Sequence, residues 1–520
     1  MPAYYLEALT ITLGLVLLLA EAFVPSKSKA WVGIAAALGL AVILGLTAIA
    51  IGPDWGVAMG LRDGVTMLVP KFPKDWMTWP LWNFYRMDSL AMFYKVFALV
   101  CTLLVVLMSV DYRKILTRYT DHPGSEDGTG EYYALPVFAC AGMMFLASAK
   151  DLAGAFVALE LVTVTFYILV AYMRRNVGSL EAGVKYLILG ALSTGFLVYG
   201  IAWVYGTTGT MNFVEIGNRL ALSRAFGDFP TAGGMISLSI PPAPLLFGIA
   251  LVMVGLGFKI GAVPMQVWIP DVYQGAPTPT TAFLSVGSKA AGFILLMRFL
   301  EPFLGSAITR GPVLNLLLIL AVATLLFGNL AAIPQTNFKR LLGYSSIAHA
   351  GFLLLALAAG MEESGGSLGS SKVVSFYLAT YLLMTLGVFF VLAQVRIRRE
   401  GEDIAHFNGL GKTNPVLAMA LTVLLAALAG VPLTAGFLGK FFVFALAVNA
   451  GLWTGIAVAF IGAAAGFYYY FNVVRAMWWA PPGDLAPVEL PAISKACVIV
   501  LTIATLVFGI YPQPILALLQ

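Results

Sequence analysis

The feature that most constrains this chain is its succession of long apolar segments. Fourteen runs of about 17 or more mostly apolar residues follow one another along 520 residues, each long enough to cross a bilayer core of about 30 Å. Apolar residues make up 60% of the chain and charged residues only 11%, so a water-soluble globule could not cover such a core. The expected spans are residues 5–24, 31–52, 88–110, 132–149, 151–173, 181–205, 244–262, 280–301, 312–333, 341–360, 373–395, 414–450, 453–479 and 493–515.

This pattern predicts an all-α polytopic membrane protein. It excludes a water-soluble enzyme, a disordered chain and a nucleic-acid binder. It also argues against an outer-membrane barrel, whose strands alternate apolar and polar residues. The first segment, 5–24, carries two glutamates and no basic leader, and we interpret it as a span and not as a cleaved signal.

Residues 414–450 decide the topology, because they form one span interrupted near Val431-Pro432 or two separate spans. One broken span gives fourteen in all, and two give fifteen. With fourteen, one set of loops holds fifteen Lys and Arg residues and the other holds nine, four of them in the long loop 53–87. The positive-inside rule places the richer set in the cytoplasm. Both termini are then expected on the outward side.

Six basic residues fall inside the expected spans, together with one deeply placed carboxylate, Glu160. A charge at the centre of a span costs roughly 2.5–3.5 kcal/mol on insertion scales, so the default interpretation of such residues is an ion path. The six are Lys95, Lys185, Lys259, Lys289, Arg298 and Lys440.

These residues do not all favour the same interpretation. Lys95 and Arg298 are near span ends and could reach the headgroups. Lys185 is about four residues into its span, where it is either an interfacial anchor or part of a path. The remaining lysines and Glu160 suit proton transfer best. Burial favours a neutral lysine and a nearby carboxylate favours a charged one, so a Glu–Lys pair can be poised to exchange a proton.

Two further signals accompany the buried lysines. His349 is the only histidine within an expected span; it is either a hydrogen-bonded core residue or a relay member, since an ordinary pKa near 6.5 suits a relay. Pro264 follows Lys259 by five residues, and Pro432 precedes Lys440 by eight. We therefore predict broken seventh and twelfth helices, whose freed backbone groups line an ion path; simple kinks are the alternative.

Two segments carry a resemblance to a known family. They are Gly257-Phe258-Lys259-Ile260-Gly261-Ala262-Val263-Pro264-Met265-Gln266-Val267-Trp268-Ile269-Pro270-Asp271-Val272-Tyr273-Gln274-Gly275-Ala276-Pro277 and Asn337-Phe338-Lys339-Arg340-Leu341-Leu342-Gly343-Tyr344-Ser345-Ser346-Ile347-Ala348-His349. Both resemble the signatures of the antiporter-like subunits of respiratory complex I and of Mrp cation/proton antiporters. The resemblance runs from about the third span to the C-terminus and leaves residues 52–87 unmatched. Three features resemble the N type. Lys440 stands where M-type subunits usually have glutamate, the sequence Val272-Tyr273-Gln274-Gly275 is N-like, and the chain ends soon after the last span without a long lateral helix.

The resemblance implies two inverted five-helix repeats, helices 4–8 and 9–13, with flanking helices. The domains expected on this basis are residues 1–110, 132–301, 312–479 and 493–515. It also implies a proton relay, because the family's helix 5 glutamate and its helix 6, 7, 8, 10 and 12 basic residues match positions in this sequence. Those positions are Glu160, Lys185, Lys259, Lys289, His349 and Lys440.

The function implied is that of a proton-translocating membrane-arm subunit of a bacterial NADH:quinone oxidoreductase, in the inner membrane with periplasmic termini. No redox cofactor or metal is expected in this chain; NADH, FMN, iron–sulfur clusters and quinone would belong to partner subunits. The expected partners are other membrane-arm subunits, including an M-type and small membrane subunits, and the lipid bilayer. The alternatives are an antiporter-like subunit of an Mrp Na⁺/H⁺ antiporter or a membrane hydrogenase, and a non-conducting scaffold subunit.

Overall fold

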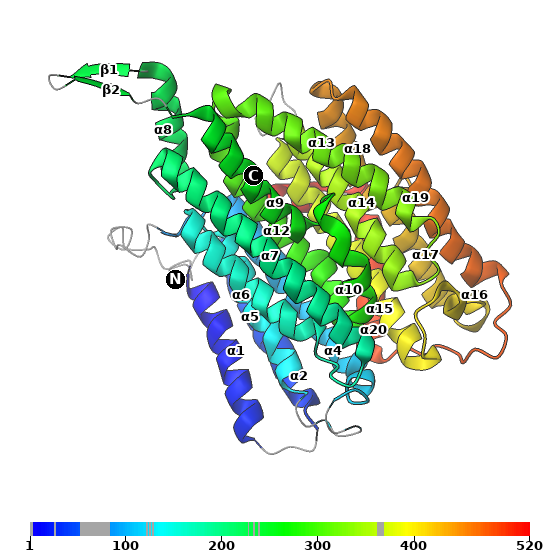
Figure 1. Ribbon diagram of the computed structural model, residues 1–520. Coiled ribbons are helices and arrows are strands. Elements are labelled where there is room, and N and C mark those ends of the chain that lie inside the picture. Colours follow the sequence, from blue (N-terminus) through cyan, green and yellow to red (C-terminus); the bar gives the residue numbers. More distant parts are fainter. Residues whose placement is uncertain are drawn as a thin grey trace, which may run out of the picture.

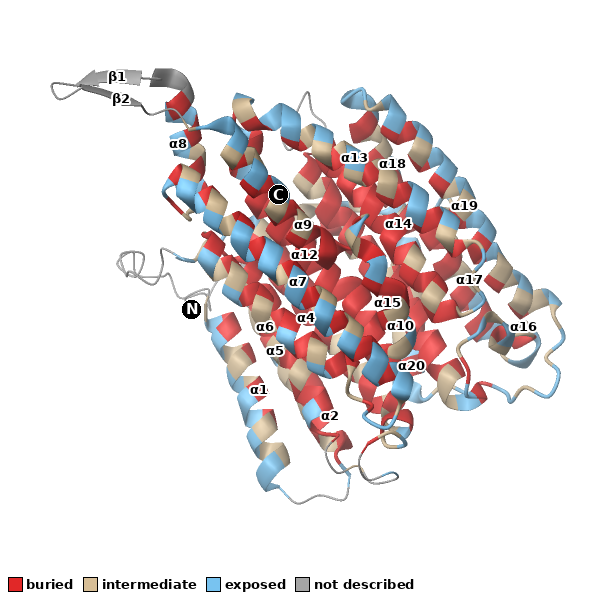
Figure 2. Ribbon diagram, viewed as in Figure 1, coloured by how far each residue is buried: buried red, intermediate tan, exposed pale blue. Residues whose placement is uncertain are grey.

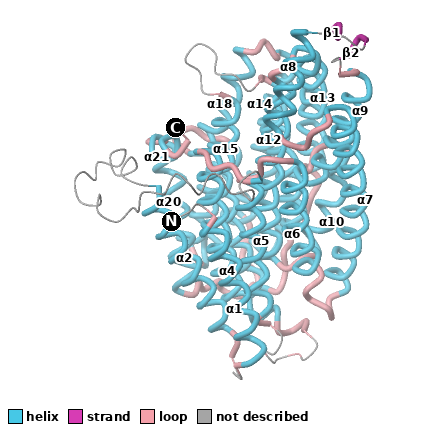
Figure 3. Tube along the Cα trace, turned by 90° about the vertical axis from the view of Figure 1, so that its left-hand side faces the viewer, coloured by secondary structure: helices cyan, strands magenta, loops and turns pink. Residues whose placement is uncertain are grey.

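The computed structural model is a bundle of long helices that run side by side (Figures 1 and 3). It describes residues 4–24, 28–51, 84–120, 123, 126, 129–226, 228–231, 234–237, 240–360 and 369–519. Most of the loop 53–87, which matched no family segment, therefore lies outside the described residues.

Twelve helical segments of the described part are long and apolar enough to cross a membrane, and α5 and the α17–α18 pair bring the spans to fourteen. In chain order the spans are α1 (Tyr5–Phe23), α2 (Ala30–Ile51), α4 (Ser89–Leu116), α5 (Glu131–Ala147), α6 (Leu152–Val170), α7 (Val177–Thr208), α9 with η3 and α10 (Pro242–Ile260, Met265–Trp268, Ile269–Gly275), α11 with η4 and α12 (Thr278–Phe283, Leu284–Ser288, Lys289–Leu304), α13 (Ala307–Ala332), α14 (Phe338–Ala358), α15 (Ser370–Arg399), α17 with α18 (Pro415–Ala429, Ala435–Asn449), α19 (Trp453–Trp479) and α20 (Ala492–Ile510).

Several spans begin at a side chain that caps the helix. Asp88 accepts from the amide of Ala91 at the start of α4, and Asp151 accepts from Gly154 at the start of α6. Asn337 does the same for α14. The first amides of a helix have no partner within it, so these short polar side chains define where each span begins.

The predicted breaks in the seventh and twelfth spans are confirmed. α9 ends at Ile260 and is followed by Gly261 at a φ of 79°; α17 ends at Ala429 and is followed by Gly430 at a φ of 96°. Only glycine adopts such left-handed angles without strain. α17 and α18 have 15 residues each, about 22 Å of helix, and neither can cross the membrane alone. Residues 414–450 are thus one broken span.

The broken span is the fourth of five in each half of the bundle. In α5–α12 it is α9–α10, and in α13–α19 it is α17–α18. This order is the one that the two expected repeats require, although the domain boundaries themselves stay a prediction.

The structure adds elements that the apolar pattern did not predict. Residues 284–288 (η4) form a π-helical turn directly before Lys289, a distortion often found at functional sites. Outside the spans lie α8 (Phe213–Phe226), a hairpin of β1 (Asp228–Thr231) and β2 (Gly234–Ser237), η5 (Ile404–Phe407), α16 (Leu410–Thr413) and α21 (Gln513–Ala517). These segments are too short to form an apolar run of membrane-spanning length, and they were missed for that reason.

Burial separates inner from outer spans (Figure 2). The most apolar stretches of α11–α12, α14 and α15 are buried almost completely within the bundle, whereas no more than 39% of those of α1, α7, α19 and α20 is buried. Exposed faces of apolar helices are suited to lipid. The charged residues on the inner spans are therefore shielded from lipid by the outer ones.

Candidate functional site

Lys259 and Glu160 meet through threonines and not as a direct ion pair. Lys259, 4% exposed, lies in the last turn of α9, where its Nζ donates to Thr163 Oγ1 at 2.6 Å. Glu160 lies one turn before Thr163 on the same face of α6 and accepts from Thr194 at 3.0 Å. Each charged group is thus bound by a different threonine hydroxyl. Glu160 and Lys259 form no direct ion pair with one another in this structure.

Lys289 follows the π-helical turn and is 2% exposed. Its Nζ donates to the carbonyl and the hydroxyl of Ser346 on α14, and it lies over the Tyr381 ring, 5.3 Å from the centroid. Ser346 Oγ also contacts the Tyr273 hydroxyl at 3.2 Å. Packing keeps α12 beside α9, because a Cβ at Gly292 would lie 2.7 Å from Ile260 Cγ2. Lys289 therefore joins α12 to α14, and Ser346 extends this contact to Tyr273 of α10 in the first broken span.

His349 on α14 is held by two tyrosine hydroxyls. Its Nδ1 contacts the Tyr377 hydroxyl at 2.7 Å and its Nε2 the Tyr470 hydroxyl at 3.3 Å. His349 is buried, and the charges of Lys440 and Lys289 act on it electrostatically. His349 is therefore a hydrogen-bonded core residue, and its membership of a relay stays a prediction.

Lys440 on α18 uses the backbone freed by the break in the twelfth span. Its Nζ donates to the carbonyls of Leu428 at 2.9 Å and Ala429 at 2.7 Å, the last residues of α17. Helix C-terminal carbonyls lack partners within the helix and carry partial negative charge, so they suit an ammonium group. The break thus supplies the site that holds a lysine inside the membrane.

We expect Gly430→Ala to disturb this site in two ways. A Cβ at residue 430 would lie 3.0 Å from Lys440 Cδ, and alanine in the left-handed region costs roughly 1–2 kcal/mol. The expected result is a lower thermal unfolding midpoint of the assembled complex together with reduced proton translocation. Gly451→Ala is the matched control, because Gly451 has a φ of 69° but open space around its Cβ position. Equal effects of the two substitutions on translocation would contradict this account.

Lys185 lies apart from the buried lysines. It is 41% exposed and pairs with Glu181 and with Asp271, each at 2.7 Å; Asp271 also pairs with Arg340 at 2.6 Å. These side chains line a cavity of about 470 Å³ that also holds Glu402. Sequence reasoning missed Asp271, Arg340 and Glu402, although the first two stand within the quoted signature segments.

The structure corrects the expectation that Lys95 and Arg298 reach the headgroups. Lys95 is fully buried and pairs with Glu7 of α1 at 2.7 Å. Arg298, 2% exposed, donates to both oxygens of Asp88 at 2.6 and 2.7 Å. Lys95 and Arg298 both pair with carboxylates from distant parts of the chain. Such pairs leave no periodic signal in a sequence.

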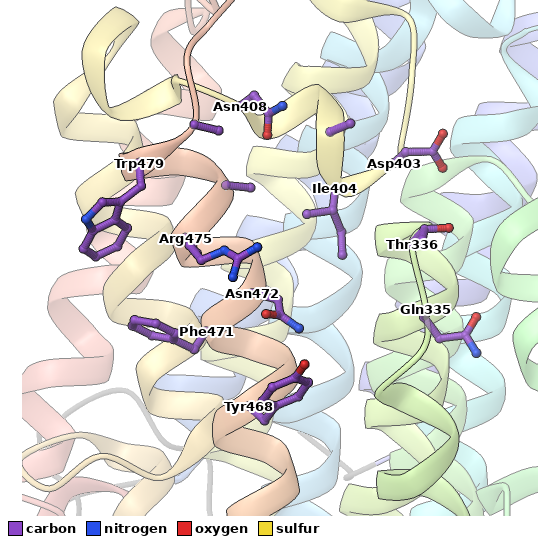
Figure 4. A pocket seen from close by; sticks show the side chains of 13 residues that line it. Gln335, Thr336, Asp403, Ile404, Asn408, Tyr468, Phe471, Asn472, Arg475 and Trp479 are labelled. Carbon is purple, nitrogen blue, oxygen red and sulfur yellow. The ribbon is translucent and has the colours of Figure 1, made fainter.

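A larger cavity lies away from these residues. It has a volume of about 970 Å³ and is formed by α19, η5 and the α13–α14 connection. Figure 4 shows Tyr468, Phe471, Asn472 and Arg475 of α19 along one wall. None of the predicted relay residues lines it, so this cavity has no part in the predicted relay.

Comparison with known proteins gives consistent matches. A family model described as "NADH:quinone oxidoreductase/Mrp antiporter, TM" matches residues 149–466. The NADH-quinone oxidoreductase subunit N of Desulforamulus reducens is 36% identical, covering 98% of this chain and 95% of the relative. Subunit N 1 of Opitutus terrae is 43% identical over 74% of this chain and 76% of its own.

The chain belongs to the subunit N family of NADH-quinone oxidoreductases.

A solved structure agrees with this membership. A chain of respiratory complex I from Thermus thermophilus with bound aureothin superposes with a TM-score of 0.74 at 29% identity, over 98% of both chains. The predicted antiporter-like fold and the N type are therefore confirmed. Among the alternatives, membership of the subunit N family favours complex I over an Mrp or hydrogenase subunit.

Proposed function

We propose that this subunit N carries protons across the membrane through Glu160, Lys259, Lys289, His349 and Lys440. The observation that supports it most is the way in which the buried ammonium groups are held. Each donates to hydroxyl or carbonyl oxygens, and no carboxylate of the described residues is in direct contact with it. A lysine in such surroundings can lose and regain a proton at modest cost, because no directly bound carboxylate stabilises its ammonium form.

The proposed transport follows from the order of these groups. A proton loads Lys259 when Glu160 pairs with it and stabilises the ammonium form. Separating that pair, so that Lys259 donates to Thr163 instead, lowers the affinity of Lys259 for the proton. The proton then moves on through Lys289 and the His349 region to Lys440. Conformational changes elsewhere in the complex would shift the equilibrium between the paired and the separated state of Glu160 and Lys259.

Proton uptake, the orientation of the chain and its partner subunits complete the proposal. In the orientation given by the positive-inside rule, the cavity lined by Lys185, Asp271 and Glu402 opens to the cytoplasm and serves proton uptake. Both termini then face the periplasm. NADH oxidation and quinone reduction take place in partner subunits, and an M-type subunit and small membrane subunits contact this chain.

The test is Glu160→Gln in the assembled complex, reconstituted in vesicles. Glutamine keeps the side-chain volume and can still accept from Thr194 but cannot favour the charged lysine, so we expect protons moved per electron pair to fall and turnover to drop about tenfold. Glu489→Gln is the control, because Glu489 is 80% exposed. Wild-type pumping in the Glu160→Gln complex, with normal assembly, would favour a non-conducting scaffold.

A further inference from the structure

The flanking helices contain a second group of buried titratable side chains, which the relay does not use. Lys95 of α4 and Glu7 of α1 pair at 2.7 Å with no exposed side-chain surface on either residue. The Tyr85 hydroxyl donates to Glu7 Oε1 at 3.1 Å and accepts from Lys95 Nζ. The three groups thus form a closed triangle of hydrogen bonds, in which a proton can pass from the ammonium to the carboxylate through the phenol.

Simple stabilisation of the bundle does not account for this pair. The desolvation of two buried charges often exceeds their mutual attraction, and apolar replacements of such pairs are frequently neutral or stabilising. α1 and α4 already have apolar partners, since both pack against α2 and α5. Ionisable residues inside a membrane protein are by default candidates for ion handling.

Tyr85 connects the pair to the surface. It lines a cavity of about 950 Å³ between α1, α5 and α6. Through Phe84 and Ala153, which line both, this cavity adjoins a second one of about 650 Å³ whose walls include Lys150, Asp151 and Glu215. Backbone bonding between residues 84–86 and 148–150 fixes Tyr85 in this position.

Few other charged or titratable groups surround this pair. Besides Glu7, the carboxylate of Asp88 acts electrostatically on Lys95, but Asp88 forms its ion pairs with Arg298 and Arg86. Burial alone would raise the pKa of the Asp88 carboxyl, but its hydrogen bonds to Arg298 hold that pKa below its usual value. Cys140 of α5 lies near Glu7. The helices α2 and α11 and the turn η4 carry no titratable side chain.

α4 links this group to the rest of the bundle. It packs against α11, against η4 directly before Lys289, and against α15, where Ser375 donates to the Tyr94 hydroxyl at 3.3 Å. Lys95 therefore lies on a helix that contacts η4, the turn directly before Lys289.

We propose that Glu7, Lys95 and Tyr85 form a second proton-exchange site, which serves the surface at the N-terminal ends of α1 and α4. In its step the Tyr85 hydroxyl proton moves to Glu7 while a Lys95 ammonium proton moves to the Tyr85 oxygen. No electrons are transferred, and the pair becomes a neutral acid and a neutral amine. Glu7 releases its proton towards the Tyr85 cavity, and a proton from the interior of the bundle recharges Lys95. The role of Glu7, Lys95 and Tyr85 in proton release rests on the proposed translocation.

The test is the double variant Glu7→Gln, Lys95→Met in the assembled complex in vesicles. It removes both charges together and leaves no unpaired ion. We expect normal assembly and an unfolding midpoint close to that of the wild type, with proton translocation reduced at least about tenfold. The matched control is Asp88→Asn, Arg298→Met. Arginine does not deprotonate in proteins, and asparagine still caps α4, so the control should keep most of its translocation.

A second measurement keeps this inference separate from the relay. Infrared difference spectra recorded between two pH values should contain a carboxyl band that is absent in Glu7→Gln, both in the wild-type complex and in one carrying Lys259→Met. The band needs no turnover, so its presence supports the site even if Lys259→Met pumps normally and the relay fails. Equal losses of translocation in the two double variants, or no band that depends on Glu7, would overturn the proposal.

Discussion

Replacement of Lys289 by methionine is expected to lower coupled NADH oxidation and proton translocation on the order of 100-fold, the usual contribution of a positioned acid–base group. Methionine fills a similar volume, so packing in the enclosed α11–α12 span should survive. What is lost is the proton carrier between Lys259 and His349, because Ser346 Oγ and its carbonyl then face an apolar side chain. Turnover and vesicle acidification of the reconstituted complex measure the effect.

Lys289→Arg separates charge from proton transfer. Arginine keeps the positive charge and can still donate to Ser346, but it does not release a proton at neutral pH. The variant should therefore be as defective as Lys289→Met. The control is Lys412→Met, which removes an exposed lysine of α16. Near wild-type translocation by Lys289→Arg would show that only charge is needed at this position.

Lys259→Met is expected to have a similarly large effect, again on the order of 100-fold. The smaller change Thr163→Val tests the geometry around it. Valine has nearly the shape of threonine but cannot accept from Lys259 Nζ, which now donates at 2.6 Å. A hydrogen bond to a charged group contributes about 1.5–3 kcal/mol, so loading of Lys259 should weaken by roughly tenfold or more.

The pH dependence of translocation distinguishes the two variants. In Thr163→Val the ammonium form loses its acceptor, and the activity limited by loading of Lys259 should fall at a lower pH than in the wild type. In Lys259→Met the residual activity should lose that dependence. Unchanged pH profiles in both variants, measured in fully assembled complexes, would remove Lys259 and its threonine from the proton path.

The span count and the positions of the breaks followed from local chemistry. A run of about 20 apolar residues has few alternatives to a membrane helix, because every backbone polar group in lipid must be satisfied within the element. Pro264 and Pro432 stand beside glycines, which mark helix ends. Residues 414–450 stayed ambiguous until the lengths of α17 and α18 were known, since hydropathy does not distinguish one broken helix from two short ones.

The relay residues could be named one by one but not paired. Glu160 and the buried lysines suited a Glu–Lys pair, and the structure places Thr194 on Glu160 and Thr163 on Lys259. Lys95 and Arg298 were assigned to the headgroups, yet Glu7 and Asp88 reach them within the bundle. Partners that are 88 or 210 residues away are brought together only by helix packing.

The sequence by itself determined that this chain is a polytopic membrane protein of the antiporter-like type, which lysines lie inside it and where two helices break. These features depend on the cost of placing polar groups in lipid, and that cost can be assessed residue by residue. The tertiary structure alone decided what each buried charge touches: a hydroxyl for Lys259, freed helix carbonyls for Lys440, and a distant carboxylate for Lys95. Such contacts depend on which helix faces meet, and no local pattern encodes that.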